Sequence, residues 1–334
     1  MQKYERRNEN YMIIREFNER NLEEAFFPVE EQPIYSVSRK IIPGYKAIVD
    51  SNTGRTLSVV SNQYCLIKNI EAYNYANYIV REVFEGKSLQ DFMCYNIIMP
   101  NTKGSCRIDL LIPNVFNKLF GDKKESWTPF VRISNSYNKT LALKYEIGFC
   151  RWICLNGVIF GQTGVSISAA HMERITYKEI DRLIAKARSS MGNISSLWKA
   201  FELKMEELRS IHLSSSSAMG IYCRVFDVKA KNSQITQLQR EGLICRAEQF
   251  TRTSREYFNE LGDNAYAMMN VLTDIASFPE WTKSPANYID GYQRRVGKWV
   301  DDITTEYKKK GFNLSDYIGA DYINTAKFME SLIK

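Results

Sequence analysis

Cationic side chains occur between apolar ones in three stretches of the chain that have the pattern of strands. Arg107 and Arg132 each lie between apolar residues, and Lys144 does the same in the stretch 140–149. Successive side chains of a strand point to opposite faces of a sheet. We therefore expect Arg107, Arg132 and Lys144 on one exposed face of an antiparallel sheet, where their charges could bind the phosphates of a nucleic acid.

Further polar side chains flank this predicted face. Lys139, Lys123 and Lys124 fall in adjoining loops, and Tyr137 could stack on a base, a contact worth about 1–3 kcal/mol. The same face also carries two carboxylates, Asp109 and Glu146. An ordinary solvated surface of mixed charge is therefore the competing interpretation of this face.

The residue types needed for catalysis are sparse. The two histidines, His171 and His212, lie far in sequence from an evident nucleophile, and the phosphate-loop, nucleophile-elbow and zinc-protease motifs are absent. Cys150 and Cys154 would be about 13 Å apart on one strand, too far for a disulfide or a shared zinc ion. We expect no enzymatic activity, no metal site and no cofactor.

An α+β fold would position the predicted basic face. The central stretch 127–160 has the pattern of a hairpin plus a third strand, and residues 45–49 and 57–60 have the pattern of a second hairpin around an Asp-Ser-Asn-Thr-Gly turn. Asn69 is a candidate N-cap for a helix that runs to about residue 84. We expect an antiparallel β-sheet with a long crossing helix and a mainly helical C-terminal half.

Helical signals dominate after the predicted sheet. Thr176 and Glu179 fit a capping box at the start of a helix whose apolar stripe extends to about residue 208. Further helices are expected over 234–261, 264–278 and 288–310, with Pro279 and Pro285 marking a break. The predicted regions are an N-terminal arm over 1–35, the sheet core with one helix over 36–165, the long helix over 166–213, and a helical C-terminal region over 218–334 that could share a domain with the sheet.

Composition sets the class of protein. A chain of 334 residues with 44% hydrophobic content can bury a sizeable core, and its formal net charge of +7 favours polyanionic partners without proving them. Apolar runs are shorter than the roughly 18 residues needed to span a bilayer, and the first residues lack the apolar segment of a signal peptide. The seven scattered cysteines are typical of free thiols in a reducing compartment. We expect a soluble, cytoplasmic protein.

Three pairs of short strings resemble the motifs of one family. They are RTLSVVSNQY at 55–64 with NIEA at 69–72, NSY at 135–137 with RWICLNG at 151–157, and GDNAY at 262–266 with NVLTD at 270–274. Over about residues 42–278 the chain resembles the phage/plasmid-like proteins catalogued as domain of unknown function 932. The matching positions include Tyr64, Asn69, Asn135, Ser136, Arg151, Cys154, Asn156, Asn270 and Thr273. The chain departs from the family pattern at 137–139, where a small or acidic turn with Gly is usual, and at Asp274, where Glu is usual.

The resemblance implies a phage or mobile-element protein of the bacterial cytoplasm, with a core similar to that of phage single-strand annealing proteins. It also groups Asn135, Ser136, Arg151, Cys154 and Asn156, although local turn chemistry would equally explain their Asn and Ser residues. Our leading hypothesis is a homo-oligomeric, non-enzymatic protein that binds single-stranded nucleic acid and acts in strand annealing or recombination. The alternative is a phage protein that binds and inhibits or redirects a host protein complex, such as a defence complex.

Overall fold

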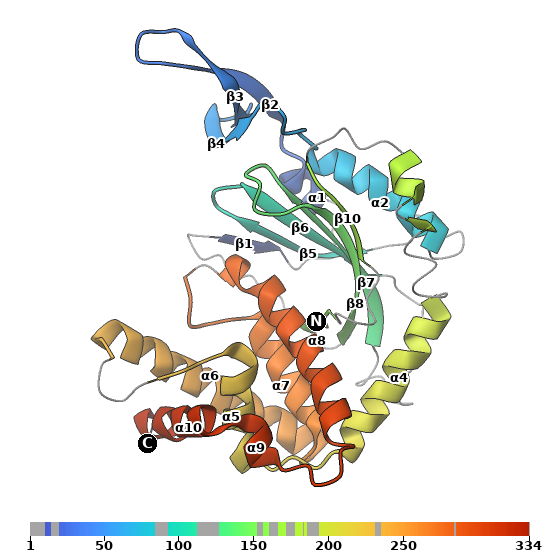
Figure 1. Ribbon diagram of the computed structural model, residues 1–334, viewed down its shortest axis with the longest axis vertical. Coiled ribbons are helices and arrows are strands. Elements are labelled where there is room, and N and C mark those ends of the chain that lie inside the picture. The colour runs from blue at the N-terminus through green and yellow to red at the C-terminus, as the bar shows by residue number, and fades with distance from the viewer. Residues whose placement is uncertain are drawn as a thin grey trace. The chain divides into compact units, whose positions relative to one another are not determined.

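The computed structural model describes residues 11–14, 20–83, 93–111, 127–151, 156–159, 166–171, 178–182, 184–185, 194–230, 235–283 and 285–333 (Figure 1). The chain divides into two units, each made of three segments. The first unit comprises Met1–Lys118, Ser126–Gly148 and Gly164–Leu197, and the second comprises Leu119–Glu125, Phe149–Thr163 and Trp198–Lys334. The predicted regions follow chain order, whereas the observed units interleave.

A seven-stranded sheet contains most of the strands. In sheet order its main path is β1 (Tyr11–Ile14), β5 (Met93–Pro100), β6 (Ser105–Leu111), β7 (Trp127–Ser136), β8 (Leu143–Arg151) and β10 (Ser166–Ala169), and β9 (Asn156–Val158) pairs with β8. The β1–β5, β5–β6, β6–β7, β8–β9 and β8–β10 pairs are antiparallel. Strands predicted in the stretches 106–112 and 127–160 are thereby confirmed.

A second, three-stranded antiparallel sheet belongs to the first unit, and we call it the ribbon. It consists of β2 (Val29–Tyr35), β3 (Ile41–Asp50) and β4 (Arg55–Ser61), in that order. The β3–β4 hairpin confirms the one predicted around the Asp-Ser-Asn-Thr-Gly turn. The predicted N-terminal arm, in contrast, contributes β1, the short helix α1 (Arg20–Ala25) and β2 to the first unit.

The core of the first unit lies on one face of its strands. Helix α2 (Asn69–Val83) contributes Ala72, Ala76 and Val80 to the same buried cluster as Ile133 of β7 and Tyr145 of β8. Leu143 and Ile147 also belong to this cluster, as the predicted alternation requires. The sequence therefore assigned the apolar face of the sheet correctly.

Helices make up most of the second unit. They are α4 (Ile194–Ser210), α5 (Ser215–Phe226), α6 (Gln237–Leu261), α7 (Ala265–Ser277), the 3-10 turn η3 (Pro285–Asn287), α8 (Ile289–Glu306), α9 (Leu314–Ile318) and α10 (Ala320–Leu332). Helix α7 contacts α6, α8 and β9, and all its residues except Asp274 are buried. Asn264 caps α7 by accepting from the Ala267 amide at 2.9 Å. Helices α6, α7 and α8 fall where the sequence predicted them.

The predicted long helix is described only in part. Residues 178–182 and 184–185 are helical, and α4 covers its C-terminal end. Thr176, at the predicted capping box, lies outside the described residues. The overall prediction of an α+β fold with antiparallel sheets and a helical C-terminal half is confirmed.

Candidate nucleic-acid interface

The predicted basic face of the seven-stranded sheet is not an exposed surface at Arg132. This side chain is 0% exposed, and its Nε and Nη2 donate to the two carboxylate oxygens of Asp109 at 2.6 Å each. Asp109 is the direct cross-strand neighbour of Arg132, and it also accepts from Asn96 Nδ2 at 3.2 Å. The prediction that Arg132 faces solvent is wrong, because alternation identifies a face but does not reveal whether that face is covered.

The other members of the predicted face are also engaged. Lys144 Nζ lies 2.7 Å from an oxygen of Glu146, which is itself buried. Arg107 is partly buried. Lys144 and Arg107 therefore point to the same face of the sheet as Arg132, as predicted. The three cations do not form a solvent-exposed basic surface there.

Tyr137 is part of the core and cannot stack on a base in this structure. Its side chain is 1% exposed, and its hydroxyl oxygen accepts from the backbone amide of Asn69 at 3.0 Å. Burial raises the pKa of Tyr137. The expectation of a stacking platform at this position is wrong, because the turn that carries Tyr137 folds its ring inward against Phe27, with the ring centroids 5.8 Å apart.

Among the described cations of the predicted set, Lys139 is the one that stays exposed. Its ammonium donates to Ser61 Oγ at 3.2 Å and lies 5.8 Å from the ring centroid of Tyr64. The residue adopts a left-handed backbone with φ of 63° in the turn that follows β7. Lys123 and Lys124 lie outside the described residues.

The bond from Lys139 leads to the ribbon, where the sequence had not placed a site. Tyr45 of β3 pairs with Ser61 of β4, and Ala47 pairs with Val59. Cross-strand partners and i, i+2 neighbours share a face. Tyr45, Val59 and Ser61 therefore lie on one face, with Tyr45 55% and Val59 58% exposed. We call Tyr45, Val59, Ser61 and Lys139 the ribbon face.

Cations outnumber free carboxylates on the ribbon. Glu31 pairs with Lys46 at 2.8 Å, and Asp50 pairs with Lys103 at 3.1 Å. Arg39, Lys40 and Arg55 of the ribbon, and Lys139 beside it, have no carboxylate within ion-pair distance among the described residues. One carboxylate of the ribbon is also free of an ion pair there: Glu30 is exposed and accepts from Gln32 Nε2 at 2.7 Å. The ribbon thus combines exposed aromatic and aliphatic side chains with unbalanced positive charge. A sequence signal for it existed in the Arg39-Lys40 pair, but only the fold shows that this segment projects.

The first group of family-motif residues forms a buried hydrogen-bond network. Asn135 Nδ2 donates to the Ile67 carbonyl at 2.8 Å and to Asn69 Oδ1 at 2.9 Å. Tyr64 Oη donates to the Ser136 carbonyl at 2.5 Å. Asn69 Oδ1 therefore accepts from Asn135 and not from the backbone amides of the first turn of α2. The predicted N-cap role of Asn69 is wrong. The network fixes the start of α2 to the end of β7 and so holds the base of the ribbon.

A second group of motif residues lies in the second unit. Arg151 is 1% exposed, and its Nη2 donates to Glu260 Oε1 at 2.9 Å. Asn270 Nδ2 donates to the Tyr266 carbonyl at 2.8 Å, and Thr273 Oγ1 donates to the Asn270 carbonyl at 3.0 Å. The backbone of Asn156 pairs with that of Arg151, and Cys154 lies outside the described residues. Asn135 and Ser136 belong to the first unit and Arg151 and Asn156 to the second, so these four of the residues that the resemblance grouped divide between the two units.

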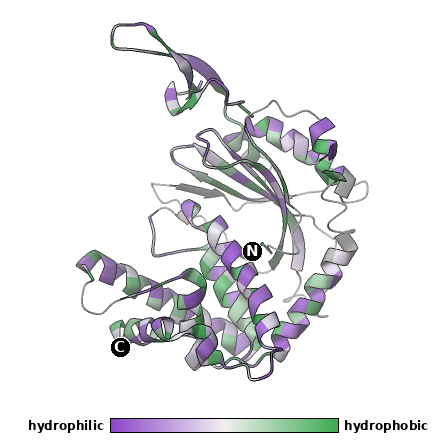
Figure 2. Cartoon of the chain, viewed as in Figure 1, coloured by the Kyte–Doolittle hydropathy of each residue, from purple (hydrophilic) through white to green (hydrophobic). Residues whose placement is uncertain are grey.

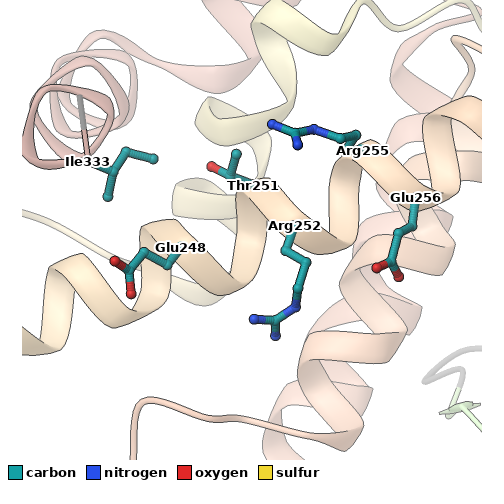
Figure 3. A pocket seen from close by; sticks show the side chains of 6 residues that line it. All are labelled: Glu248, Thr251, Arg252, Arg255, Glu256 and Ile333. Carbon is teal, nitrogen blue, oxygen red and sulfur yellow. The ribbon is translucent and has the colours of Figure 1, made fainter.

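A shallow depression of about 380 Å³ lies along α6 (Figure 3). It is lined by Glu248, Thr251, Arg252, Arg255, Glu256 and Ile333. Arg252 Nη2 is 2.8 Å from both carboxylate oxygens of Glu280, and the lining side chains spread along the helix rather than converge on one point. Such mixed, divergent charges do not form a catalytic arrangement.

The described part of the chain provides neither a cluster of metal ligands nor a membrane-spanning helix. Groups of three or more His, Cys, Asp or Glu side chains that could hold a metal ion are absent from these residues. Cys65, Cys106, Cys150, Cys223 and Cys245 are free thiols. Among the helices of the described residues, none is long and apolar enough to cross a membrane.

Fold and site define an α+β protein with an exposed, cation-bearing β-ribbon and a buried polar network that joins the start of α2 to the end of β7. The model of a family described as a domain of unknown function, DUF932, matches residues 56–284, and the chain belongs to that family. This match includes the motif residues of both groups described above. No curated protein and no solved structure matches the chain.

Proposed function

We propose that this protein is a non-enzymatic binding protein for single-stranded nucleic acid, and that it makes contact through the ribbon face. One observation supports the proposal most directly. Ser61 is the cross-strand partner of the exposed Tyr45, and its hydroxyl accepts a hydrogen bond from the ammonium group of Lys139. An aromatic ring beside an ammonium group matches the two parts of a nucleotide, because the ring stacks on a base and the cation binds a phosphate.

The charge of the ribbon supports the same partner. Arg39 and Lys40 add positive charge at the turn that precedes β3, and the ribbon's two ion-paired carboxylates, Glu31 and Asp50, are paired with lysines. Each phosphate neutralised by such a cation releases a counterion, so binding to single strands should weaken with salt by a slope of about −0.7 per contact. Strand annealing and homo-oligomer formation are part of this proposal, as is the phage or mobile-element setting that the family resemblance implied.

The test is fluorescence anisotropy of a dye-labelled oligothymidine strand with the full-length chain. Replacing Tyr45→Ala together with Lys139→Glu removes the ring and reverses the charge. One lost stacking contact alone is worth about 1–3 kcal/mol, so affinity should fall by about tenfold or more. Binding by the double variant at the parent's affinity would overturn the proposal.

A matched control separates the ribbon face from total charge. Lys199 of α4 and Tyr307 at the end of α8 are both exposed, and they belong to the second unit. Lys199→Glu with Tyr307→Ala therefore changes net charge and aromatic content by the same amount. The control should bind as the parent does, and an equal loss in both double variants would show that the ribbon face is not the site.

Binding to a host protein complex is the second candidate function. Two apolar side chains of the second unit favour it, since Leu203 of α4 is 54% exposed and Leu238 of α6 is 79% exposed. Capture of a partner from nuclease-treated host lysate would support this candidate if Leu203→Ser with Leu238→Ser abolished the capture. Loss of the partner on nuclease treatment would instead support the nucleic-acid proposal.

A further inference from the structure

The hairpin of β2 and β3 extends beyond the third strand of the ribbon. Pairing of β3 with β4 ends at Tyr45–Ser61, whereas pairing of β3 with β2 continues to Tyr35–Ile41. Figure 1 shows this hairpin leading away from α2, β5 and β6 of the same unit. We call residues 35–42 the hairpin tip. Its side chains are exposed except that of Ser36, which is partly buried.

The turn at the hairpin tip is held by several hydrogen bonds. The Ser36 amide donates to the Lys40 carbonyl at 2.7 Å, and the Arg39 amide donates to the Ser36 carbonyl at 2.9 Å. The Lys40 amide also donates to Ser36 Oγ at 3.2 Å. Arg39 takes the left-handed conformation, with φ of 59°, that closes such turns. The apex is therefore a defined structure that presents Val37 in a fixed position.

Apolar and cationic side chains share this apex. Val37 is fully exposed, and Tyr35 and Ile41 are 56% and 61% exposed. Arg39 and Lys40 lie between Val37 and Ile41 in the chain, and among the described residues neither has a carboxylate at ion-pair distance. Hydrophilic and hydrophobic residues are mixed along the hairpin (Figure 2). Contiguous exposed apolar side chains mark an interaction site, and the unpaired cations beside them favour a polyanion as the partner.

We propose that the hairpin tip is a wedge that inserts Val37 between adjacent bases of the bound strand, while Arg39 and Lys40 hold the phosphates on either side. This inference depends on the proposed function, because the ribbon face and the tip belong to one continuous surface of β3. Apolar side chains that enter a base step, flanked by cations, unstack the bases. The branched Cβ of valine restricts its rotamers, which suits a wedge that must not fold away. Unstacked bases would be available for pairing with a complementary strand.

Two signals measured on one oligonucleotide test the wedge. The strand carries a single 2-aminopurine flanked by adenines, whose emission rises on unstacking, and an end dye whose anisotropy reports binding. The parent should raise both signals. Val37→Ser should lose the rise in 2-aminopurine emission while its Kd changes by less than about threefold, because the phosphate contacts remain. Arg39→Ala with Lys40→Ala should flatten the salt slope by about 1.4, corresponding to two phosphate contacts.

Leu238→Ser provides the control, since it replaces an exposed apolar side chain of the second unit and should leave both signals unchanged. If the parent fails to raise the anisotropy, the proposed function itself is wrong. If the parent binds without a rise in emission, or if Val37→Ser keeps the rise, the wedge is wrong and the binding function stands. If Val37→Ser instead lowers the mass of an assembly in light scattering and leaves the emission unchanged, the tip contacts a second copy of the chain, which also overturns the wedge.

Discussion

The buried polar face of the seven-stranded sheet and the exposed ribbon contain the same residue types in opposite states. In the sheet, the Arg132 guanidinium donates two hydrogen bonds of 2.6 Å to the Asp109 carboxylate and is buried. On the ribbon face, Lys139 contacts the Ser61 hydroxyl and the Tyr64 ring, has no carboxylate at ion-pair distance among the described residues, and is exposed. Positive residues in a sequence therefore predict a polyanion site only where the fold leaves them without carboxylates. Substitutions on each surface, in the order of their expected effect, test this contrast.

Loss of the Arg132 side chain should give the largest effect. Arg132→Ala leaves Asp109 buried and unpaired, and breaking a buried pair in this way costs about 3–5 kcal/mol. Urea unfolding followed by circular dichroism measures the loss. Replacing both partners, as Arg132→Met with Asp109→Leu, should recover most of the stability. Unfolding of Arg132→Ala at the parent's urea concentration would contradict the view that this cation is structural.

Acid should weaken the base of the ribbon through His171. This ring stacks on Tyr64 at 5.0 Å, and its Nδ1 donates to the Cys65 carbonyl at 3.2 Å. Burial lowers the pKa of His171, although the bond to Cys65 opposes the shift. An unfolded histidine has a pKa of about 6.5, so below that pH the unfolded state binds more protons. The stability that neutral His171 contributes is thus present above that pH and is lost as pH falls toward the folded pKa.

The measurement compares urea unfolding at about pH 7.5 and about pH 5.5, on either side of the unfolded pKa. His171→Gln should lose less stability on acidification than the parent does. His212→Gln serves as the control because that side chain is exposed. An identical pH response in the parent and in His171→Gln would exclude this histidine as the source.

Removal of the Lys144 charge should give the smallest effect. Lys144 is 32% exposed and pairs with Glu146, and a partly exposed pair of this kind contributes about 0–1 kcal/mol. Lys144→Gln should therefore leave the affinity for a single strand and its salt slope unchanged. Lys139→Gln, at the same loss of charge, should flatten the slope by about 0.7. If the salt dependence of single-strand affinity were the same in both variants, the ribbon face and the buried face of the sheet would not differ in phosphate binding.

Local pattern predicted the apolar face of the sheet and the helices α6, α7 and α8. It predicted a helical region from residue 218 but no separate helix at α5, because Ser214 and the three serines that open the helix have the composition of a loop. From Ala218 to Phe226 only Arg224 is exposed, so α5 lacks the amphipathic period by which surface helices are detected. Burial against other elements, and not local preference, determines this helix.

The candidate site was predicted less well than the fold, for a related reason. Strand parity at Arg132 and Lys144 was correct, but the cover over that face arises from contacts that alternation does not encode. Lys139 was identified as an exposed loop cation, whereas its neighbour Tyr45 was assigned only to a strand. The pairing that joins them, Tyr45 with Ser61, is a register, and register depends on the turn and on packing.

The interleaving of the two units constrains how the polypeptide is made. Gly164–Leu197 completes the first unit, but Phe149–Thr163, which precedes it, belongs to the second. During synthesis the first unit can therefore be complete only after residue 197 has left the ribosome. Phe149–Thr163 has emerged by then, but it cannot pack until the helices of the second unit follow. A premature stop codon after residue 197 would leave Phe149–Thr163 without the helices of its own unit. A single proteolytic cut also cannot separate the two units, because each is made of three segments.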